Sequence, residues 1–193
     1  MTNVTSLRRT RSVPTYLQLR IELTDIEPAI WRRVVVPGTL TLGKLHQVIQ
    51  AAMGWTDTHL HEFDIAGCRF GISDADWPSD VVSEKRVRLD TALCGKKTFY
   101  YIYDFGDHWA HRIKVEKARS VDLGLTYPLC LDGANACPPE DCGGVPGYET
   151  LRAALASPDH PERNEFLTWL GQDFDPAAFD PLITDQALQR IKL

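Results

Sequence analysis

The spacing of apolar residues changes along the chain, and this change limits the folds that the sequence can adopt. Residues 16–23 (YLQLRIEL) alternate apolar and polar side chains, which is the pattern of a strand with one face in water. In residues 42–53 the apolar residues instead recur at helical spacing, at Leu42, Leu45, Val48, Ile49, Ala52 and Met53. Since neither pattern extends over the whole chain, the sequence predicts a fold of mixed helices and strands.

Further segments show the same two patterns. Short runs rich in β-branched and aromatic residues predict more strands, at residues 29–36, 59–65, 67–70, 98–103 and 112–115. Helical spacing returns near the C-terminus, at residues 148–156, 161–170 and 176–191. Strands with one early packed helix, followed by helices, predict an α+β fold with a mixed or antiparallel sheet and a C-terminal helical section from about residue 148. The opening strand–strand–helix–strand order is compatible with a β-grasp-like core.

Length and composition fit a small globular protein. The chain has 193 residues, of which 44% are hydrophobic and 24% charged, so we expect a single domain over residues 14–193. Residues 1–13 lack periodicity, so we expect them to form a flexible arm. No run approaches the ~18 apolar residues of a membrane span, and the N-terminus lacks an export signal, so we expect a cytoplasmic protein without membrane contact. The odd number of cysteines, five, favours reduced thiols over a disulfide framework.

Charge is unevenly distributed along the chain. Residues 1–131 carry 17 Lys and Arg against 15 Asp and Glu, whereas residues 132–193 carry 4 against 11, and the net charge is −5. The chain as a whole is therefore not a basic nucleic-acid-binding domain. A basic cluster occurs in the expected arm, at Arg8, Arg9 and Arg11. This arm is either a solvated tail or a contact to nucleic-acid phosphates, and the acidic C-terminal part is suited to docking a basic protein partner.

Residues 127–148 are rich in proline, glycine and cysteine and show no periodicity. Loops of this length inside a domain are uncommon, and they are usually functional or held in place by a ligand. A structural zinc ion would order this loop through four ligands, which we expect to be Cys130, Cys137, Cys142 and His111, or His108 in place of His111. The spacings lack the paired knuckles of common zinc modules, so buried reduced thiols are the alternative.

Two histidines and two aspartates form a second set of candidates. His59 and His61 are two residues apart on a predicted strand, so both point to one face. They either share a metal ion or substrate, or pack at the edge of the core. Asp104 and Asp107 lie in the segment DFGDHWAH, where two carboxylates and two imidazoles could perform acid–base chemistry or hold a divalent ion. Alternatively, these carboxylates only stabilise the turn of a hairpin.

Five motifs occur in order along the chain. They are DIEPAIWRR (25–33), LGKLHQVIQAAMGW (42–55), HLHEF (59–63), YDFGDHWAH (103–111) and CPPEDCGG (137–144), followed by Gly147 and Tyr148. Together they resemble the plasmid pRi open-reading-frame-three-like family, whose members are often labelled TnpR-like insertion-element passenger proteins. The resemblance covers residues 16–180 and implies an α+β cytoplasmic domain linked to plasmids and transposable elements, with no defined biochemical activity. The sequence shows no active-site arrangement of a serine or tyrosine recombinase.

Two functions from different classes fit these observations. The sequence has no phosphate-binding loop, nucleophile elbow or HExxH zinc motif, which favours a non-enzymatic accessory module that binds protein or nucleic acid. The alternative is a metal-dependent hydrolase-like enzyme built on the histidine and aspartate candidates. A metal ion with an open coordination position would favour the enzyme, whereas four protein ligands would indicate a structural site.

Overall fold

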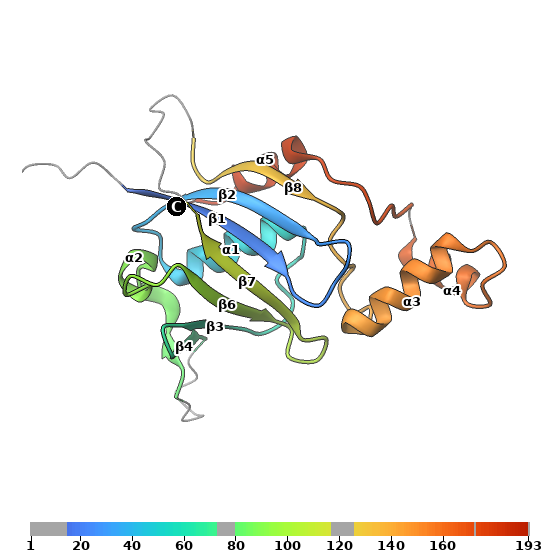
Figure 1. Ribbon diagram of the computed structural model, residues 1–193, viewed down its shortest axis with the longest axis horizontal. Coiled ribbons are helices and arrows are strands. Elements are labelled where there is room, and N and C mark those ends of the chain that lie inside the picture. The colour runs from blue at the N-terminus through green and yellow to red at the C-terminus, as the bar shows by residue number, and fades with distance from the viewer. Residues whose placement is uncertain (1–14, 73–79, 117–125, 172, 193) are drawn as a thin grey trace, which may run out of the picture.

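An eight-stranded sheet forms the centre of the computed structural model, which describes residues 15–72, 80–116, 126–171 and 173–192 (Figure 1). Its strands are β1 (Tyr16–Leu23), β2 (Trp31–Pro37), β3 (His61–Ile65), β4 (Cys68–Gly71), β5 (Val82–Ser83), β6 (Thr98–Tyr103), β7 (Trp109–Val115) and β8 (Leu129–Ala134). They are ordered β5-β4-β3-β6-β7-β1-β2-β8, and each neighbouring pair is antiparallel except β4 and β5. The predicted α+β class is confirmed.

The described part of the chain contains five α-helices. They are α1 (Leu42–Met53), α2 (Leu89–Ala92), α3 (Gly144–Ala156), α4 (Arg163–Leu170) and α5 (Pro181–Leu188), with a short 3-10 helix, η1 (Glu84–Arg86). Helices α1 and α5 contact each other and pack on β2 and β8, whereas α3 and α4 extend to one side (Figure 1). Within the described ranges, none of the helices has the length and apolar character that a membrane span requires.

Helix α1 begins and ends where its sequence predicts. The backbone amide of Lys44 donates a 3.4 Å hydrogen bond to Thr41 Oγ1, which caps the N-terminus. Gly54 ends the helix in the left-handed conformation, with φ of 91°, which glycine adopts without strain. Leu45 and Ile49 have no exposed surface. The apolar stripe therefore anchors α1 on the inner face of the sheet.

The sheet differs from the expectation in its centre and at one edge. Strand β1 is antiparallel to both β2 and β7, so the central parallel pair of a β-grasp core is missing. Strand β8 lies in the segment that was expected to be irregular. A Cβ at Gly133 in this strand would lie 2.6 Å from Phe179 Cζ, so glycine is required by close packing here and does not mark a loop.

The C-terminal helices also have other bounds than expected. Helix α3 begins at Gly144, four residues before the expected start, and α5 is shorter than the expected 176–191. A Cβ at Gly147 would lie 1.8 Å from Cys142 O, so this glycine permits a tight entry into α3 instead of breaking the helix. The expected N-terminal arm, residues 1–13, lies outside the described residues.

Candidate functional site

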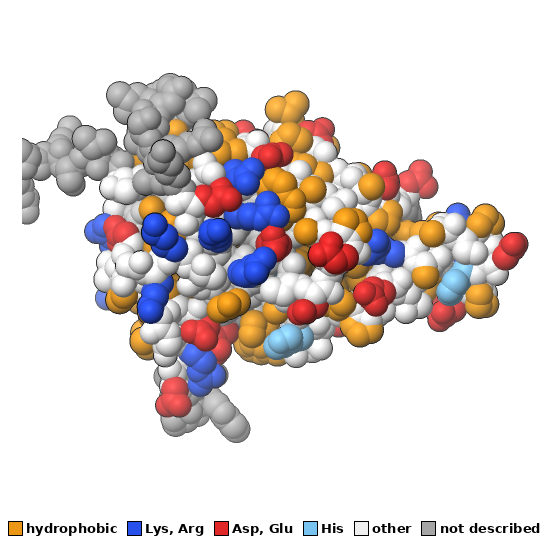
Figure 2. Space-filling model, in the orientation of Figure 1, with side chains coloured by type: hydrophobic (Ala, Val, Ile, Leu, Met, Phe, Trp, Pro, Cys, Tyr) orange, Lys and Arg blue, Asp and Glu red, His pale blue; other side chains and the backbone are white. Residues whose placement is uncertain are grey.

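In the described part of the chain, one face of the sheet carries no helix. Helix α1 lies behind the strands in Figure 1, and β6, β7, β1 and β2 face the viewer. Figure 2 shows Lys and Arg side chains gathered over these strands. We term this surface the open face and define it by Arg20, Trp31, Arg33, Tyr100, Arg112 and Lys114.

The strand register aligns three cations of the open face in one row. Lys114 on β7 lies opposite Arg20 on β1, and Arg20 lies opposite Arg33 on β2. Neighbouring strands are about 4.8 Å apart, so the backbone positions of the row span about 10 Å across the sheet. Three like charges at this spacing form a continuous positive stripe unless carboxylates interrupt it.

A second row lies next to the first and carries the aromatic residues. Tyr100 on β6 pairs with Arg112 on β7, Arg112 with Glu22 on β1, and Glu22 with Trp31 on β2. Tyr100 is 51% exposed, and Trp31 is half-buried. Two aromatic rings therefore flank the cations, one on each side of the central strands.

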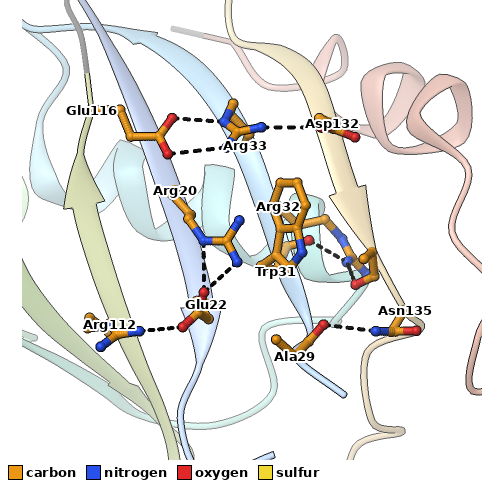
Figure 3. A network of polar contacts seen from close by, with 11 residues as sticks. Arg20, Glu22, Ala29, Trp31, Arg32, Arg33, Arg112, Glu116, Asp132 and Asn135 are labelled. Carbon is orange, nitrogen blue, oxygen red and sulfur yellow. Dashed lines mark hydrogen bonds and ion pairs between the residues drawn. The ribbon is translucent and has the colours of Figure 1, made fainter. Parts of the chain in front are cut away.

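Glu22 holds two of the arginines in fixed positions (Figure 3). Its carboxylate lies 2.6 Å from Arg20 Nη2 and 2.6 Å from Arg112 Nη2. Partial burial alone would raise the pKa of Glu22, but hydrogen bonds and charge attraction from both arginines outweigh burial and lower it. The Arg20 guanidinium in turn lies 4.0 Å above the Trp31 ring, a cation–π contact.

Arg33 is held in a similar way at the other end of the stripe. Its Nε lies 2.8 Å from Glu116 Oε2, and its Nη1 lies 3.2 Å from Asp132 Oδ2 (Figure 3). The hydrogen bond from Arg33 lowers the pKa of Glu116, so this carboxylate is charged at neutral pH. Arg33 also lies 4.9 Å from the centre of the Trp31 ring. Arg20 and Arg33 thus both contact the ring of Trp31.

The open face is hollowed at its centre. A shallow cavity of about 470 Å³ is lined by Arg20, Glu22, Thr98, Tyr100, Arg112, Lys114 and Glu116. Over the whole network, four cations stand against three carboxylates, whereas the chain as a whole is acidic. Ordered guanidinium groups next to aromatic rings are suited to contact anions and to stack on planar groups.

His59 lies elsewhere, beside the β6–β7 hairpin. Its Nδ1 is 3.7 Å from Asp104 Oδ2 and its Nε2 is 3.2 Å from Asp141 Oδ1. One potential ligand atom from each of the three residues lies within 4.8 Å of the others. The structure therefore brings together the predicted candidates His59 and Asp104, and it adds Asp141.

His61 does not join His59 but lies in the core. Its Nε2 is 2.9 Å from Glu84 Oε2, and its ring stacks on His46 with centroids 3.5 Å apart and planes 5° apart. His46 contacts Tyr101 OH at 2.8 Å through Nδ1 and Asp57 Oδ1 at 2.7 Å through Nε2. This cluster links α1, β3, β6 and η1 in the interior.

The histidine stack is tied into the core by hydrogen bonds, although His46, Asp57 and His61 also offer ligand atoms within 4.8 Å of one another. Gln50 donates to Tyr101 OH at 3.1 Å, burial raises the pKa of Tyr101, and burial together with His61 lowers the pKa of His46. A neutral His46 thus accepts from Tyr101 and donates to Asp57. An imidazole binds a metal through a lone pair in the ring plane. Because the His46 and His61 planes are parallel and separate, one ion cannot lie in both.

The expected zinc ligands do not appear among the groups of neighbouring ligand atoms in the described residues. Among the described residues, two groups of three or more potential ligands have atoms within 4.8 Å of one another, and neither contains a cysteine. Burial raises the pKa of Cys130 to about 11 and of Cys142 to about 12, and it raises the pKa of Cys137 as well. His111 is fully buried and its Nδ1 donates to Trp109 O at 2.9 Å. The thiolate zinc site stays a prediction without support from this geometry.

The remaining candidates lie on the tip of the β6–β7 hairpin. Asp107 Oδ2 accepts a 3.1 Å hydrogen bond from the amide of Gly143, which joins the hairpin to the start of α3. His108 is exposed in the turn, with φ of 57°. Asp104 Oδ1 accepts from the amide of Gly106 at 2.9 Å, the turn contact that its sequence predicts.

Sequence reasoning did not find the open face, and it did not place Asp141 beside His59. Arg20, Arg33 and Lys114 each lie in a predicted strand, which was the available signal. Their alignment depends on strand register, and register between strands distant in sequence is not encoded in either strand alone. Asp141 appeared as a charge in an irregular segment, and no periodicity indicated which way it points.

Comparisons with known proteins agree with this fold. Residues 15–182 match the family described as plasmid pRiA4b ORF-3-like protein. The chain belongs to the plasmid pRiA4b ORF-3-like family. The resemblance inferred from the five motifs is thereby confirmed, whereas the TnpR-like label finds no support in these comparisons.

Two relatives of this pRiA4b ORF-3-like protein cover most of its length. The uncharacterized protein y4hQ of Sinorhizobium fredii (strain NBRC 101917 / NGR234) is 44% identical over 169 residues, which are 86% of this chain and 87% of y4hQ. The crystal structure of the protein of unknown function MM3350 from Methanosarcina mazei Go1 is 39% identical, with a TM-score of 0.82 over 89% of this chain and 98% of that one. The family is thus plasmid-associated by name, and these relatives have no described activity.

Proposed function

We propose that this pRiA4b ORF-3-like protein is a non-enzymatic binding module that holds single-stranded nucleic acid on its open face. The row of Lys114, Arg20 and Arg33 across three adjacent strands is the observation that carries the proposal. Phosphate groups bind such rows through charge attraction and bidentate guanidinium contacts. A plasmid-associated family is a natural setting for such a partner.

The aromatic residues favour a single strand over a duplex. Tyr100 and Trp31 flank the cations on the strand row beside them, and bases of a single strand are free to stack on such rings. In a duplex the bases are stacked on each other, so a flat sheet face reaches only the phosphates. The open face therefore fits a strand whose backbone follows the cations while its bases contact the rings.

The carboxylates of the network set the strength of binding. Glu22, Glu116 and Asp132 offset three of the four cations, so we expect modest affinity that weakens as salt rises. The same carboxylates hold the guanidinium groups in place, which lowers the entropy cost of ordering them in a complex. Arg8, Arg9 and Arg11 lie outside the described residues and would add phosphate contacts if the arm reaches the strand.

Fluorescence anisotropy with a labelled oligothymidine, longer than the ~4–16 nucleotides that one site of this kind covers, tests the proposal. The double variant Arg112→Ala, Lys114→Ala removes two cations, and we expect binding to weaken at least about tenfold. Tyr100→Ala should cost about 1–3 kcal/mol of binding free energy through lost stacking. Both variants leave the inner face of the sheet untouched.

Arg190→Ala serves as the matched control, because Arg190 is exposed beyond the end of α5 and away from the open face. Its affinity should equal that of the wild type. A second comparison removes residues 1–13. If the deletion abolishes binding while the double variant does not affect it, the arm and not the open face is the nucleic-acid contact. Undetectable binding at low salt by the folded wild type would exclude a nucleic-acid ligand.

A further inference from the structure

We propose that His59, Asp104 and Asp141 form a binding site for a divalent first-row transition-metal ion. The site lies apart from the open face and does not depend on the nucleic-acid proposal. It combines one imidazole with two carboxylates from three separate segments of the chain. Ligand atoms from all three residues lie within 4.8 Å of one another.

The separations agree with coordination of one ion. Ligands at about 2.1 Å from a metal are about 3.0–3.4 Å apart in octahedral or tetrahedral geometry. His59 Nε2 lies 3.2 Å from Asp141 Oδ1, within this range. Asp104 Oδ2 lies 3.7 Å from His59 Nδ1, on the other side of the ring. The Asp104 carboxylate either joins the ion or holds the ring as an outer partner.

The charges around His59 call for a cation. A neutral imidazole has one N–H donor and one bare nitrogen, but here both ring nitrogens face a carboxylate. With a neutral ring, one carboxylate oxygen would face a lone pair, an arrangement that a bound metal ion relieves. His59 Nε2 is buried from solvent and makes no hydrogen bond, although Asp141 lies beside it. A metal ion between Nε2 and Asp141 satisfies both atoms.

The backbone around the site is held by other contacts, so the ligands are positioned before an ion arrives. Glu140, next to Asp141, accepts hydrogen bonds from Tyr103 OH at 2.5 Å and from the amide of Thr56 at 3.1 Å. It also accepts from Thr58 Oγ1 at 3.1 Å, directly before His59. Glu140 thus joins the two segments that carry Asp141 and His59.

The donor set selects the class of metal. Imidazole nitrogen favours zinc, iron, nickel and related ions over magnesium and calcium, which prefer oxygen ligands alone. Three protein ligands leave at least one position for water. The site differs from the expected thiolate site in its ligands, so the two are separable by experiment.

Isothermal titration of the full chain with Zn²⁺ tests the site. We expect one ion per chain, and we expect Asp141→Asn and His59→Gln each to weaken binding at least about tenfold. Asp141 is mostly exposed, so its variant should fold normally, which circular dichroism would verify. The controls are His160→Ala, a histidine outside both ligand groups, and Cys137→Ser in the cysteine segment. Both should bind as the wild type does.

Cobalt substitution gives an independent readout of the ligands. Nitrogen and oxygen ligation gives weak visible bands, whereas thiolate ligation adds intense near-ultraviolet charge-transfer absorption, which we expect to be absent. The proposal is overturned if the folded wild type binds no Zn²⁺. It is equally overturned if Asp141→Asn binds as tightly as the wild type, or if Cys137→Ser abolishes binding and the cobalt spectrum shows thiolate ligation.

Discussion

Arg32 Nε donates a 3.0 Å hydrogen bond to the carbonyl oxygen of Ala52, in the last turn of α1. Arg32 Nη1 donates to the carbonyls of Trp31 at 2.9 Å and Ala134 at 3.0 Å, and the guanidinium lies 4.4 Å from the centre of the Phe179 ring. Burial lowers the pKa of this arginine, whereas its hydrogen bond to a carbonyl in the last turn of α1 favours the charged form. One buried cation thus joins β2, α1, β8 and the segment before α5.

Replacement of Arg32 by Met should destabilise the fold by about 2–4 kcal/mol, because it leaves three carbonyl oxygens without their donor. Urea unfolding followed by circular dichroism measures the change. Arg190→Met is the matched control, and its effect should stay within about 0.5 kcal/mol. Equal stability of the Arg32 variant and the wild type would show that Arg32 does not hold the helices on the sheet.

His111 should make the fold sensitive to acid. Burial lowers its pKa from 6.5 to about 4. Between these two pH values His111 is therefore mostly protonated in the unfolded chain and mostly neutral in the folded chain. Its contribution to stability is therefore present above the unfolded pKa and is lost as the pH falls from about 6.5 to about 4. Between pH 7 and pH 5 we expect a loss of about 2 kcal/mol from this residue.

The variant His111→Asn isolates this effect, since asparagine can still donate to Trp109 O but does not titrate. It should reduce the difference in unfolding free energy between pH 7 and pH 5 by about 2 kcal/mol, whatever its stability at pH 7. His160→Ala should leave the difference unchanged. An unaltered pH dependence in His111→Asn would mean that this imidazole is accessible to protons.

The apolar stripe of α1 should dominate the contact between helix and sheet. Leu45→Ala or Ile49→Ala should each cost about 2–5 kcal/mol, because both side chains are fully buried and leave a cavity. Gln47, on the exposed side of the same helix, is the control. Gln47→Ala should change stability by no more than about 0.5 kcal/mol, and a similar small change at Leu45 would show that the wrong face was assigned.

The five thiols should react at two different rates. Cys68 and Cys94 are exposed, whereas burial raises the pKa of Cys130, Cys137 and Cys142 and keeps them protonated. A colorimetric thiol reagent should therefore label the first two rapidly and the other three only on unfolding. Rapid labelling of all five in the folded protein would contradict the described packing of the cysteine segment.

The sequence predicted correctly those helices and strands whose apolar spacing is regular along the whole element. β1, β6 and α1 have the bounds that their alternation or helical spacing predicts. β8 was missed because Gly133 and its neighbours carry no strand pattern. Glycine is needed at this position because Phe179 packs closely against the strand. The candidate sites depend on tertiary contacts. His59 precedes β3, which begins at His61, so the two do not share a strand face as expected. Asp141 and Glu84, from distant segments, hold them in two separate clusters.

The central claim, that the open face is the nucleic-acid contact, is tested most directly by mapping amide chemical shifts of the isotope-labelled protein during titration with oligothymidine. The proposal predicts that the largest changes fall on β7, β1 and β2, at Arg112, Lys114, Arg20 and Arg33, and at Tyr100 on β6. The changes should fade as salt rises from about 50 to 200 mM. Changes confined to residues 1–13 or to α4 and α5, with the open face unaffected, would contradict it.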